Sequence, residues 1–280
     1  MKFKTSAHIA QRVFKTPLAL HPDKALVIAN VLAQRDGFEA LEGGVYANSK
    51  KSKGYDLIGS IAVIPVIGTL VQKLESLTPE SGMTGYNGIR ANFFTAIADP
   101  NVKAIVFDID SPGGEVSGCF DLVDAIYEAR GKKPIWSILS ESAYSAAYAI
   151  ASAADIITVP RTGGTGSIGV IWMHADRSGE LDKAGIKVTL VKFGALKAEG
   201  NEFSPLGEAQ ERIQAEINTM GELFVSTVSR NRGISADTVR ATEAGTFNGA
   251  AGVELGLADG VYSPDAAFSE LQKLIGDVNE

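Results

Sequence analysis

The chain has 280 residues, of which 45% are hydrophobic and 21% are charged, a composition that is ordinary for a globular protein with a sizeable buried core. Its formal net charge of −7 argues against a nucleic-acid-binding surface, because no net basic field is available to neutralise phosphates. The single cysteine, Cys119, excludes an internal disulfide and fits a reducing compartment. Free cysteines mostly behave as small buried hydrophobes, and we favour that interpretation over a reactive thiol.

The N-terminal part, residues 1 to about 42, is expected to form a helical arm. Its longest apolar run, residues 25–33, is too short to span a bilayer and indicates a short helix begun by Asp23. No targeting segment is visible, so the sequence predicts a cytosolic protein that does not contact a membrane. Residues 43–55 are polar, basic and rich in glycine, which is typical of an exposed linker.

From residue 57 onward, short β-rich runs alternate with helical patterns. This alternation predicts an α/β fold in which helices form layers on a largely parallel sheet. We expect the main domain to cover residues 56–265, between the arm and linker of residues 1–55 and a helical tail of residues 266–280. The expected strands are residues 61–67, 104–109, 135–139, 156–159, 168–173 and 188–193. The expected helices are residues 87–98, 118–129, 145–154, 179–184 and 205–230, the last one begun by Ser204 and Pro205.

A glycine turn follows the second expected strand, in the run Asp110-Ser111-Pro112-Gly113-Gly114. Two glycines at such a turn let the backbone approach a ligand closely and direct N–H groups toward it. Acyl-transfer enzymes need donors of this kind for the oxygen of the tetrahedral intermediate. The alternative is that Pro-Gly-Gly is simply a favourable turn.

Ser145 stands between the strand expected at residues 135–139 and the small-residue run 146–154. A helix begun there collects unpaired N–H groups and the positive end of the helix dipole next to the hydroxyl, which favours a developing oxyanion. Lys197 lies between Gly194 and Gly200 and can supply a base, because a buried neutral amine can replace the imidazole of a Ser–His–Asp arrangement. The alternatives are a helix-capping serine and a solvated lysine.

Two other residues bear on this site. Ser167 lies in the glycine-rich run 163–169, which lacks the Gly-Lys-Ser/Thr ending of a phosphate loop and indicates a turn that points its hydroxyl into a site. His174 ends an expected strand, so a Ser–His pair with Ser145 is the main rival to the Ser–Lys pair. No cluster of His, Cys and acidic residues at ligand spacing is present in the sequence, so we expect neither a metal nor a cofactor.

Taken together, these segments resemble the Ser–Lys peptidases of the signal peptide peptidase A family, which have the Clp protease/crotonase fold. The resemblance rests on residues 110–114, 142–147, 165–170, 194–200 and 246–259. A narrower likeness, to the head-maturation proteases of lambda-like phages and prophages, rests on residues 8–10, 17–18, 67–71 and 81–89. The membrane anchor that is usual in the bacterial enzymes is missing here, which supports the phage interpretation.

The resemblance implies that Ser145 is the nucleophile, Lys197 the general base and Ser167 the group that holds the amine. It also implies an oxyanion hole made by the N–H groups of Gly113 or Gly114 and of Ala146. Ring-like homo-oligomers are implied too, in which the serine and the lysine come from adjacent subunits. The implied substrates are extended segments with small or apolar residues at the cleavage point.

The leading hypothesis is a prohead protease in the host cytoplasm that cleaves scaffold, portal or capsid proteins, or its own arm, within the assembling phage head. A second hypothesis is a cytosolic peptidase that degrades signal-peptide remnants. A crotonase-type acyl-CoA enzyme is a third, although that class normally uses acidic residues. The fourth is a non-catalytic capsid assembly protein that retains the fold.

Overall fold

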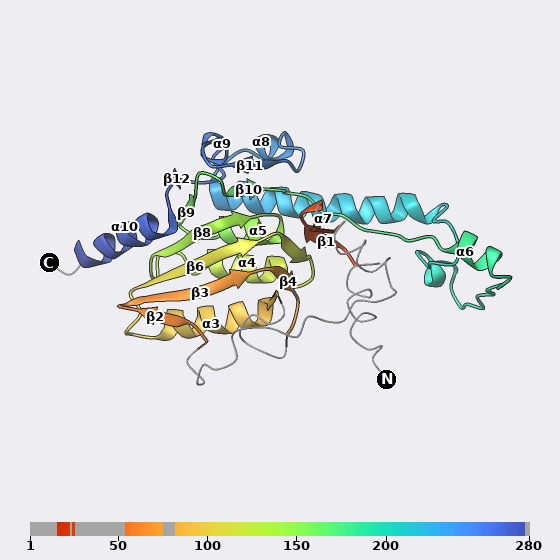
Figure 1. Cartoon of the computed structure of the whole chain (residues 1–280), viewed down its shortest axis with the longest axis horizontal. Helices are drawn as coiled ribbons and strands as arrows, with labels where there is room; N and C mark the ends of the chain where they lie inside the picture. Colours follow the sequence, from red (N-terminus) through yellow and green to blue (C-terminus); the bar gives the residue numbers. More distant parts are fainter. Residues whose placement is uncertain (1–15, 23, 26–53, 75–81, 278–280) are drawn as a thin grey trace.

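The computed structural model of the chain describes residues 16–22, 24, 25, 54–74 and 82–277. Its centre is a six-stranded sheet with the strand order β12-β9-β8-β6-β3-β2 (Figure 1). Neighbouring strands are parallel except for β2 and β3, which pair antiparallel. In that order the strands are β12 Gly260–Val261, β9 Ile156–Val159, β8 Ile135–Ala143, β6 Ala104–Ser111, β3 Ile61–Ile67 and β2 Asp56–Ile58.

Two smaller sheets extend this framework. A four-stranded sheet has the order β1-β7-β4-β5, and a two-stranded antiparallel sheet pairs β10 with β11. Because β4 follows β3 after one residue and β7 follows β6 after one residue, the four-stranded sheet begins where these central strands end. The strands are β1 Leu18–Leu20, β7 Gly113–Glu115, β4 Thr69–Val71, β5 Met83–Gly85, β10 Gly164–Gly166 and β11 Thr246–Asn248.

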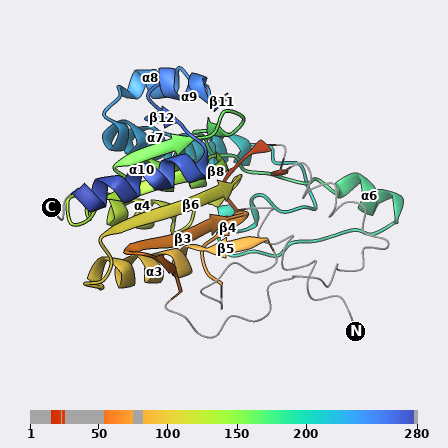
Figure 2. The same ribbon diagram turned by 60° about the vertical axis from the view of Figure 1, so that its left-hand side comes forward.

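Helices cover both faces of the six-stranded sheet. On one face lie α3 Tyr86–Ala98, α4 Cys119–Tyr127 and α5 Ala146–Ser152, and on the other lies α10 Pro264–Asp277, which crosses the sheet in Figure 2. The alternation along β3 explains this layering, because successive side chains point to opposite faces. Ile64 enters the larger core with α3, α4 and α5, whereas Ile61 packs with Ala267 and Leu271 of α10.

The alanine-rich helix α5 lies at the centre of the molecule, and every one of its seven residues is buried. Small side chains allow the close approach that this position requires, because α5 contacts β6, β7, β8, α4 and α7. The predicted run of small residues is therefore confirmed as a closely packed helix.

The remaining helices are α6 Ser178–Lys183, the 3-10 helix η1 Ala195–Ala198, α7 Ala209–Arg232, α8 Ala236–Arg240 and α9 Ala250–Glu254. The C-terminal part of α7 packs in the core through Phe224 and Val228. Its N-terminal part projects from the body, and the segment with α6 stands away from the sheet in both views (Figures 1 and 2).

Several predicted elements are confirmed: the strands at residues 61–67, 104–109, 135–139 and 156–159, and a helix that overlaps each of the five expected ranges. The strand predicted at residues 168–173 is wrong, because only Ile171 finds a partner, in an isolated bridge to Leu18. The strand predicted at residues 188–193 is also wrong, because this exposed stretch has no neighbouring strand in the described part of the chain. The long helix begins at Ala209 with Glu208 as its N-cap, so Ser204 and Pro205 do not start it.

The predicted N-terminal arm and linker lie largely outside the described residues. Within the arm, residues 18–20 form strand β1 rather than a helix, and Pro22, Lys24 and Ala25 form a helical turn. The linker ends in an anchored residue, because Tyr55 is buried and its hydroxyl donates to the Asp99 carboxylate at 3.0 Å. The last residue of the predicted exposed linker therefore belongs to the core.

Candidate active site

Ser145 is held at the start of α5 in a backbone conformation that is rare for a residue with a side chain, with φ 56° and ψ −121°. Such a conformation costs about 1–3 kcal/mol and persists where its surroundings enforce it. Here the Ser145 N–H donates to the Gly166 carbonyl at 2.9 Å, and the Ser145 carbonyl accepts from Ala149 N–H at 2.9 Å. The Ser145 side chain is almost fully buried, and its hydroxyl makes one long hydrogen bond, 3.4 Å, to the Gly169 carbonyl.

Gly113 lies directly against Ser145. Its φ is 96°, and a Cβ built on it would lie 3.0 Å from the Ser145 Cβ, 2.9 Å from the Tyr144 carbonyl oxygen and 2.2 Å from the Ala19 carbonyl oxygen. Only glycine fits this position, both for its backbone conformation and for lack of space. Gly114 is excluded from carrying a side chain by the Leu70 carbonyl oxygen. The turn is therefore closely packed against the protein's own backbone, and the approach of a ligand to it stays a prediction.

The donors around Ser145 differ in their availability. Gly113 N–H donates to the Ser111 hydroxyl at 3.2 Å, and that hydroxyl in turn donates to the Gly68 carbonyl at 2.6 Å. Ala146 is the first residue of α5, where an N–H has no acceptor within the helix. Gly114 N–H belongs to β7, which pairs with β1 along one edge and with β4 along the other.

Ser167 lies in the same cluster as Ser145. It follows β10 with φ 53°, is buried, and donates its N–H to the Gly245 carbonyl at 2.7 Å. Because Gly166, the residue before it, accepts the hydrogen bond from Ser145 N–H, the two serines are fixed by neighbouring backbone groups. The structure therefore brings together Ser145, Ser167, Gly113, Gly114 and Ala146.

Lys197 is not part of this cluster within a single chain. It lies in η1 with an exposed side chain, and its amine makes no hydrogen bond or ion pair to any residue in the described ranges. The segment around it, residues 186–196, exposes an unusual amount of apolar surface. Val191 and Phe193 are 97% and 98% exposed, and Ile186, Val188, Leu190 and Leu196 are exposed as well. We call residues 186–196 the apolar segment.

His174 also lies apart from Ser145. Its Nε2 is 2.7 Å from the Asn201 carbonyl oxygen, and its ring stacks on Trp172 with a centroid distance of 6.0 Å. The structure thus pairs His174 with Asn201 rather than with Ser145.

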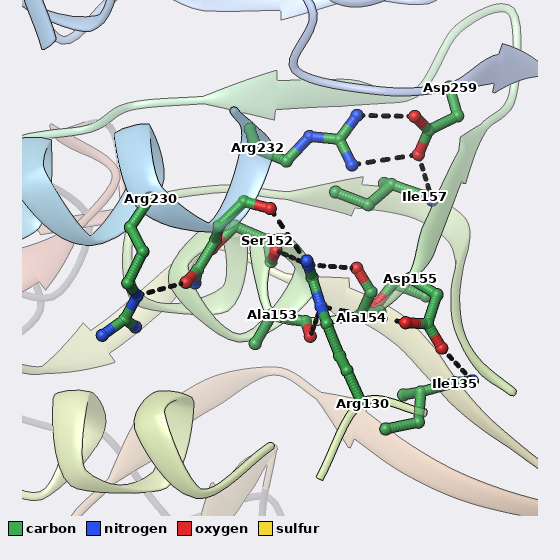
Figure 3. Close-up of polar contacts among 12 residues, drawn as sticks. Arg130, Ile135, Ser152, Ala153, Ala154, Asp155, Ile157, Arg230, Arg232 and Asp259 are labelled. Carbon is green, nitrogen blue, oxygen red and sulfur yellow. Dashed lines mark hydrogen bonds and ion pairs between the residues drawn. The ribbon is translucent and has the colours of Figure 1, made fainter. Parts of the chain in front are cut away.

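Behind the site, Arg130 holds the C-terminal end of α5 (Figure 3). Its guanidinium donates to the carbonyls of Ser152, Ala153 and Ala154 at 2.9, 2.9 and 2.6 Å, and to the Asn231 carbonyl at 3.1 Å. Burial lowers the pKa of Arg130, and nearby Asp155 opposes that shift. The sequence analysis missed this group, because nothing in the local pattern links Arg130 to carbonyls more than twenty residues away.

An ion pair fixes the neighbouring strand β9. Arg232, largely buried, forms a two-fold contact with the Asp259 carboxylate, whose Oδ2 also accepts from Ile157 N–H at 2.7 Å (Figure 3). Because Ile157 belongs to β9 and Arg232 ends α7, this pair ties α7 to the sheet beside α5.

Cys119 is confirmed as a buried residue. Burial raises the pKa of its thiol to about 12, and its Sγ lies 3.8 Å from the Ala146 carbonyl oxygen. A thiol in this state is a packing group rather than a nucleophile.

The described residues contain no group of three or more His, Cys, Asp and Glu side chains arranged to hold a metal ion. Among their helices, none is both long enough and apolar enough to cross a membrane.

Comparison with known proteins gives a consistent assignment. The model of Peptidase family S49 matches residues 128–277. The chain is 38% identical to "Head-tail preconnector protein GP5" of Enterobacteria phage P21 over 94% of this chain, and 37% identical to "Capsid assembly protease C" of Escherichia phage lambda over 95% of it. It spans 56% and 65% of the length of these two relatives. It is also 32% identical to "Putative signal peptide peptidase SppA" of Enterococcus faecium, over 64% of this chain and 54% of that protein.

Proposed function

Since the chain belongs to peptidase family S49, we propose that it is a serine endopeptidase of phage head maturation, in which Ser145 is the nucleophile and Lys197 the general base. Ser167 orients the lysine amine, and the N–H groups of Ala146 and of Gly113 or Gly114 form the oxyanion hole. The fold class that accompanies this proposal is the Clp protease/crotonase-like fold. No cofactor takes part in the reaction.

The conformation of Ser145 is the observation that carries the proposal. A nucleophile needs a fixed backbone, a hydroxyl that is not locked in strong hydrogen bonds, and N–H donors beside it. Ser145 meets these needs through its enforced positive φ, its single long hydrogen bond and its place at the first turn of α5. Each oxyanion donor is worth about 3–4 kcal/mol of transition-state stabilisation in comparable enzymes.

The position of Lys197 supports a site shared between subunits. A lysine amine takes up a proton only when it is neutral, and removal from water favours the neutral form. Lys197 is exposed in one chain, whereas Ser145 and Ser167 are buried. We therefore assign the base of each site to the Lys197 of a neighbouring copy.

The apolar segment supports the same assembly. Val191 and Phe193 present large apolar side chains to water, and a backbone stretch without a neighbouring strand is a template for pairing with another chain. Helix α7 adds partly exposed apolar side chains of its own, because Ile213, Ile217 and Met220 are only half-buried. A ring-like homo-oligomer would cover both surfaces and bring Lys197 to the neighbour's serine.

The phage role is favoured over the signal-peptide role by the extent of the similarity. The two phage relatives match 94% and 95% of this chain, whereas the Enterococcus faecium protein matches 64%. The proposed substrates are therefore scaffold, portal or capsid proteins, cut within the assembling head in the host cytoplasm. We expect cleavage in extended segments with small or apolar residues at the cleavage point.

The test co-expresses the chain with the candidate scaffold and portal proteins and measures intact masses. Defined fragments should appear with the wild type and with His174→Ala, and should be absent with Ser145→Ala and with Lys197→Ala. Loss with His174→Ala and survival with Lys197→Ala would refute the assignment of the base.

Mixing the two inactive variants tests the shared site. In a mixed ring, a working site needs the serine of a Lys197→Ala chain and the lysine of a neighbouring Ser145→Ala chain, so roughly a quarter of the sites should regain activity after random equal mixing. A mixture that stays inactive, although mass measurements show mixed rings, would place both residues in one chain.

A further inference from the structure

The N-terminal strand β1 lies along the glycine turn beside Ser145. It pairs antiparallel with β7, with Leu18 opposite Glu115, Ala19 opposite Gly114 and Leu20 opposite Gly113. The pairing continues at both ends, because Val116 N–H donates to the Pro17 carbonyl at 3.2 Å and His21 N–H donates to the Pro112 carbonyl at 2.8 Å. Residues 17–21 therefore follow the full length of the turn that carries the candidate oxyanion donors.

The other edge of β1 is also occupied. Leu18 exchanges two backbone hydrogen bonds with Ile171, Leu18 N–H to the Ile171 carbonyl at 2.9 Å and Ile171 N–H to the Leu18 carbonyl at 2.8 Å. Leu18, Ala19 and Leu20 are all buried, and the two leucines pack with Ala25, Ile171 and Met173. An extended segment held by backbone bonds on both edges is how a groove binds a peptide by strand addition.

Ala19 lies beside Gly113, which itself lies against the candidate nucleophile Ser145. Antiparallel pairs alternate between hydrogen-bonded and non-hydrogen-bonded, so the bonds at Pro17 and His21 make Ala19 and Gly114 a hydrogen-bonded pair. The Ala19 carbonyl then faces Gly114 N–H. The same carbonyl oxygen and the Ser145 Cβ both crowd the empty side of Gly113, at 2.2 and 3.0 Å from the Cβ that a side chain there would need. The Ala19 carbonyl therefore lies beside both Ser145 and a glycine N–H, the two groups that an acyl substrate of a serine enzyme must meet.

We propose that β1 occupies the substrate groove as an internal substrate and that the bond between Ala19 and Leu20 is cut by Ser145 of the same chain. This inference rests on the proposed function, because it uses Ser145 as the nucleophile. It identifies the small residue at the cleavage point as Ala19, whose side chain is wholly enclosed. It also accounts for the burial of Ser145, since an outside substrate enters only after residues 17–21 leave.

The reaction consumes one water. The Ser145 oxygen bonds to the Ala19 carbonyl carbon, and the hydroxyl proton passes through the lysine amine to the nitrogen of Leu20 as the Ala19–Leu20 bond breaks. Water then attacks the ester between Ala19 and Ser145, which restores the hydroxyl and leaves a carboxyl group on Ala19. The products are residues 1–19 and a chain that begins at Leu20.

The experiment follows the intact mass of the purified full chain over time. Wild type should be converted to a chain that begins at Leu20, with release of residues 1–19, and Ser145→Ala should keep its full mass. Ala19→Trp should lose the cut because the enclosed position has no room for the indole, whereas Ala19→Ser should retain it. Lys24→Trp is the matched control for added bulk, because Lys24 is exposed in the same segment, and it should be cut as wild type is.

Two further arms separate the possible failures. When unlabelled wild type is mixed with nitrogen-15-labelled Ser145→Ala, the labelled chain should stay intact, because each serine cuts its own β1; cleavage of the labelled chain would overturn the inference. Unfolded casein is the outside substrate. Ser145-dependent cleavage of casein by a wild type that keeps residues 1–19 would overturn the inference and leave the proposed function standing. If neither the chain nor casein is cut in a Ser145-dependent way, the proposed function fails and the inference fails with it.

Discussion

Replacing Arg130 by methionine tests how strongly the far end of α5 supports the site. The guanidinium satisfies four carbonyl oxygens, those of Ser152, Ala153, Ala154 and Asn231, and methionine fills a similar volume without a donor. One hydrogen bond to a charged group is worth about 1.5–3 kcal/mol, but four bonds that share one guanidinium do not add, and water can reach part of this group. We expect the free energy of unfolding to fall by about 3 kcal/mol, within the range for breaking one side of a buried ionic contact.

The assay is urea unfolding of Arg130→Met and of a matched control, Arg240→Met. Arg240 pairs with the carboxylates of Glu222 and Asp237 but is 47% exposed, so its loss should shift the unfolding midpoint little. Arg130→Met should also lower kcat more than it changes KM, because α5 carries Ser145 at its other end. A loss of stability below about 1 kcal/mol for Arg130→Met, or one equal to that of the control, would refute this reasoning.

Three other predictions concern the site and its surroundings. Gly113→Ala should lower kcat about a hundredfold, the size of effect seen when an oxyanion donor is displaced. The control Gly131→Ala, at a similar φ but with nothing within 4 Å of the added Cβ, should leave kcat unchanged. Equal activities of the two variants would contradict the argument that Gly113 has no room for a side chain. Phe193→Asp should reduce both the oligomer mass in sedimentation and the cleavage rate while leaving the melting temperature of the chain unchanged, because Phe193 makes almost no contact within one chain; an unchanged oligomer mass would exclude the apolar segment from the interface. Burial raises the pKa of the Cys119 thiol from 9.0 to about 12, so the contribution of the thiol to stability is complete below pH 9 and is lost as the pH rises toward 12. Over that range the free energy of unfolding should fall less steeply in Cys119→Ala than in the wild type. Parallel plots of this free energy against pH would refute the raised pKa of Cys119.

The sequence was sufficient to predict the elements whose partners are all in the core. Strands β3, β6 and β9 are short apolar runs between turn signals, and helix α5 follows from its small residues. The cluster around Ser145 was also predictable in outline, because Gly113, Gly114, Ser145 and Ser167 belong to motifs with a local chemical meaning. The backbone conformation of each residue is set by its near neighbours in the sequence, which a local pattern can indicate.

Other features depend on contacts between distant parts of the chain and could not be predicted. The apolar pattern of residues 168–173 and 188–193 is that of strands, but a strand forms only where another backbone pairs with it. Ile171 pairs with one residue, and the apolar segment with none in the described part of this chain. Strands β1 and β7 have three residues each, too few for a periodic pattern. Arg130 reaches Asn231 across 101 positions, a contact that no local pattern indicates.

The apolar segment also has a consequence for the timing of the reaction. If the proposed base belongs to the neighbouring chain, dilute single chains carry a complete nucleophile and no base, and the number of active sites then rises more steeply than the amount of protein. Such an enzyme stays silent while it is synthesised and spread through the cell volume. In the proposed phage role, packing many copies into one closed shell would raise their local concentration enough to start the reaction, and confinement itself would set the moment of cleavage.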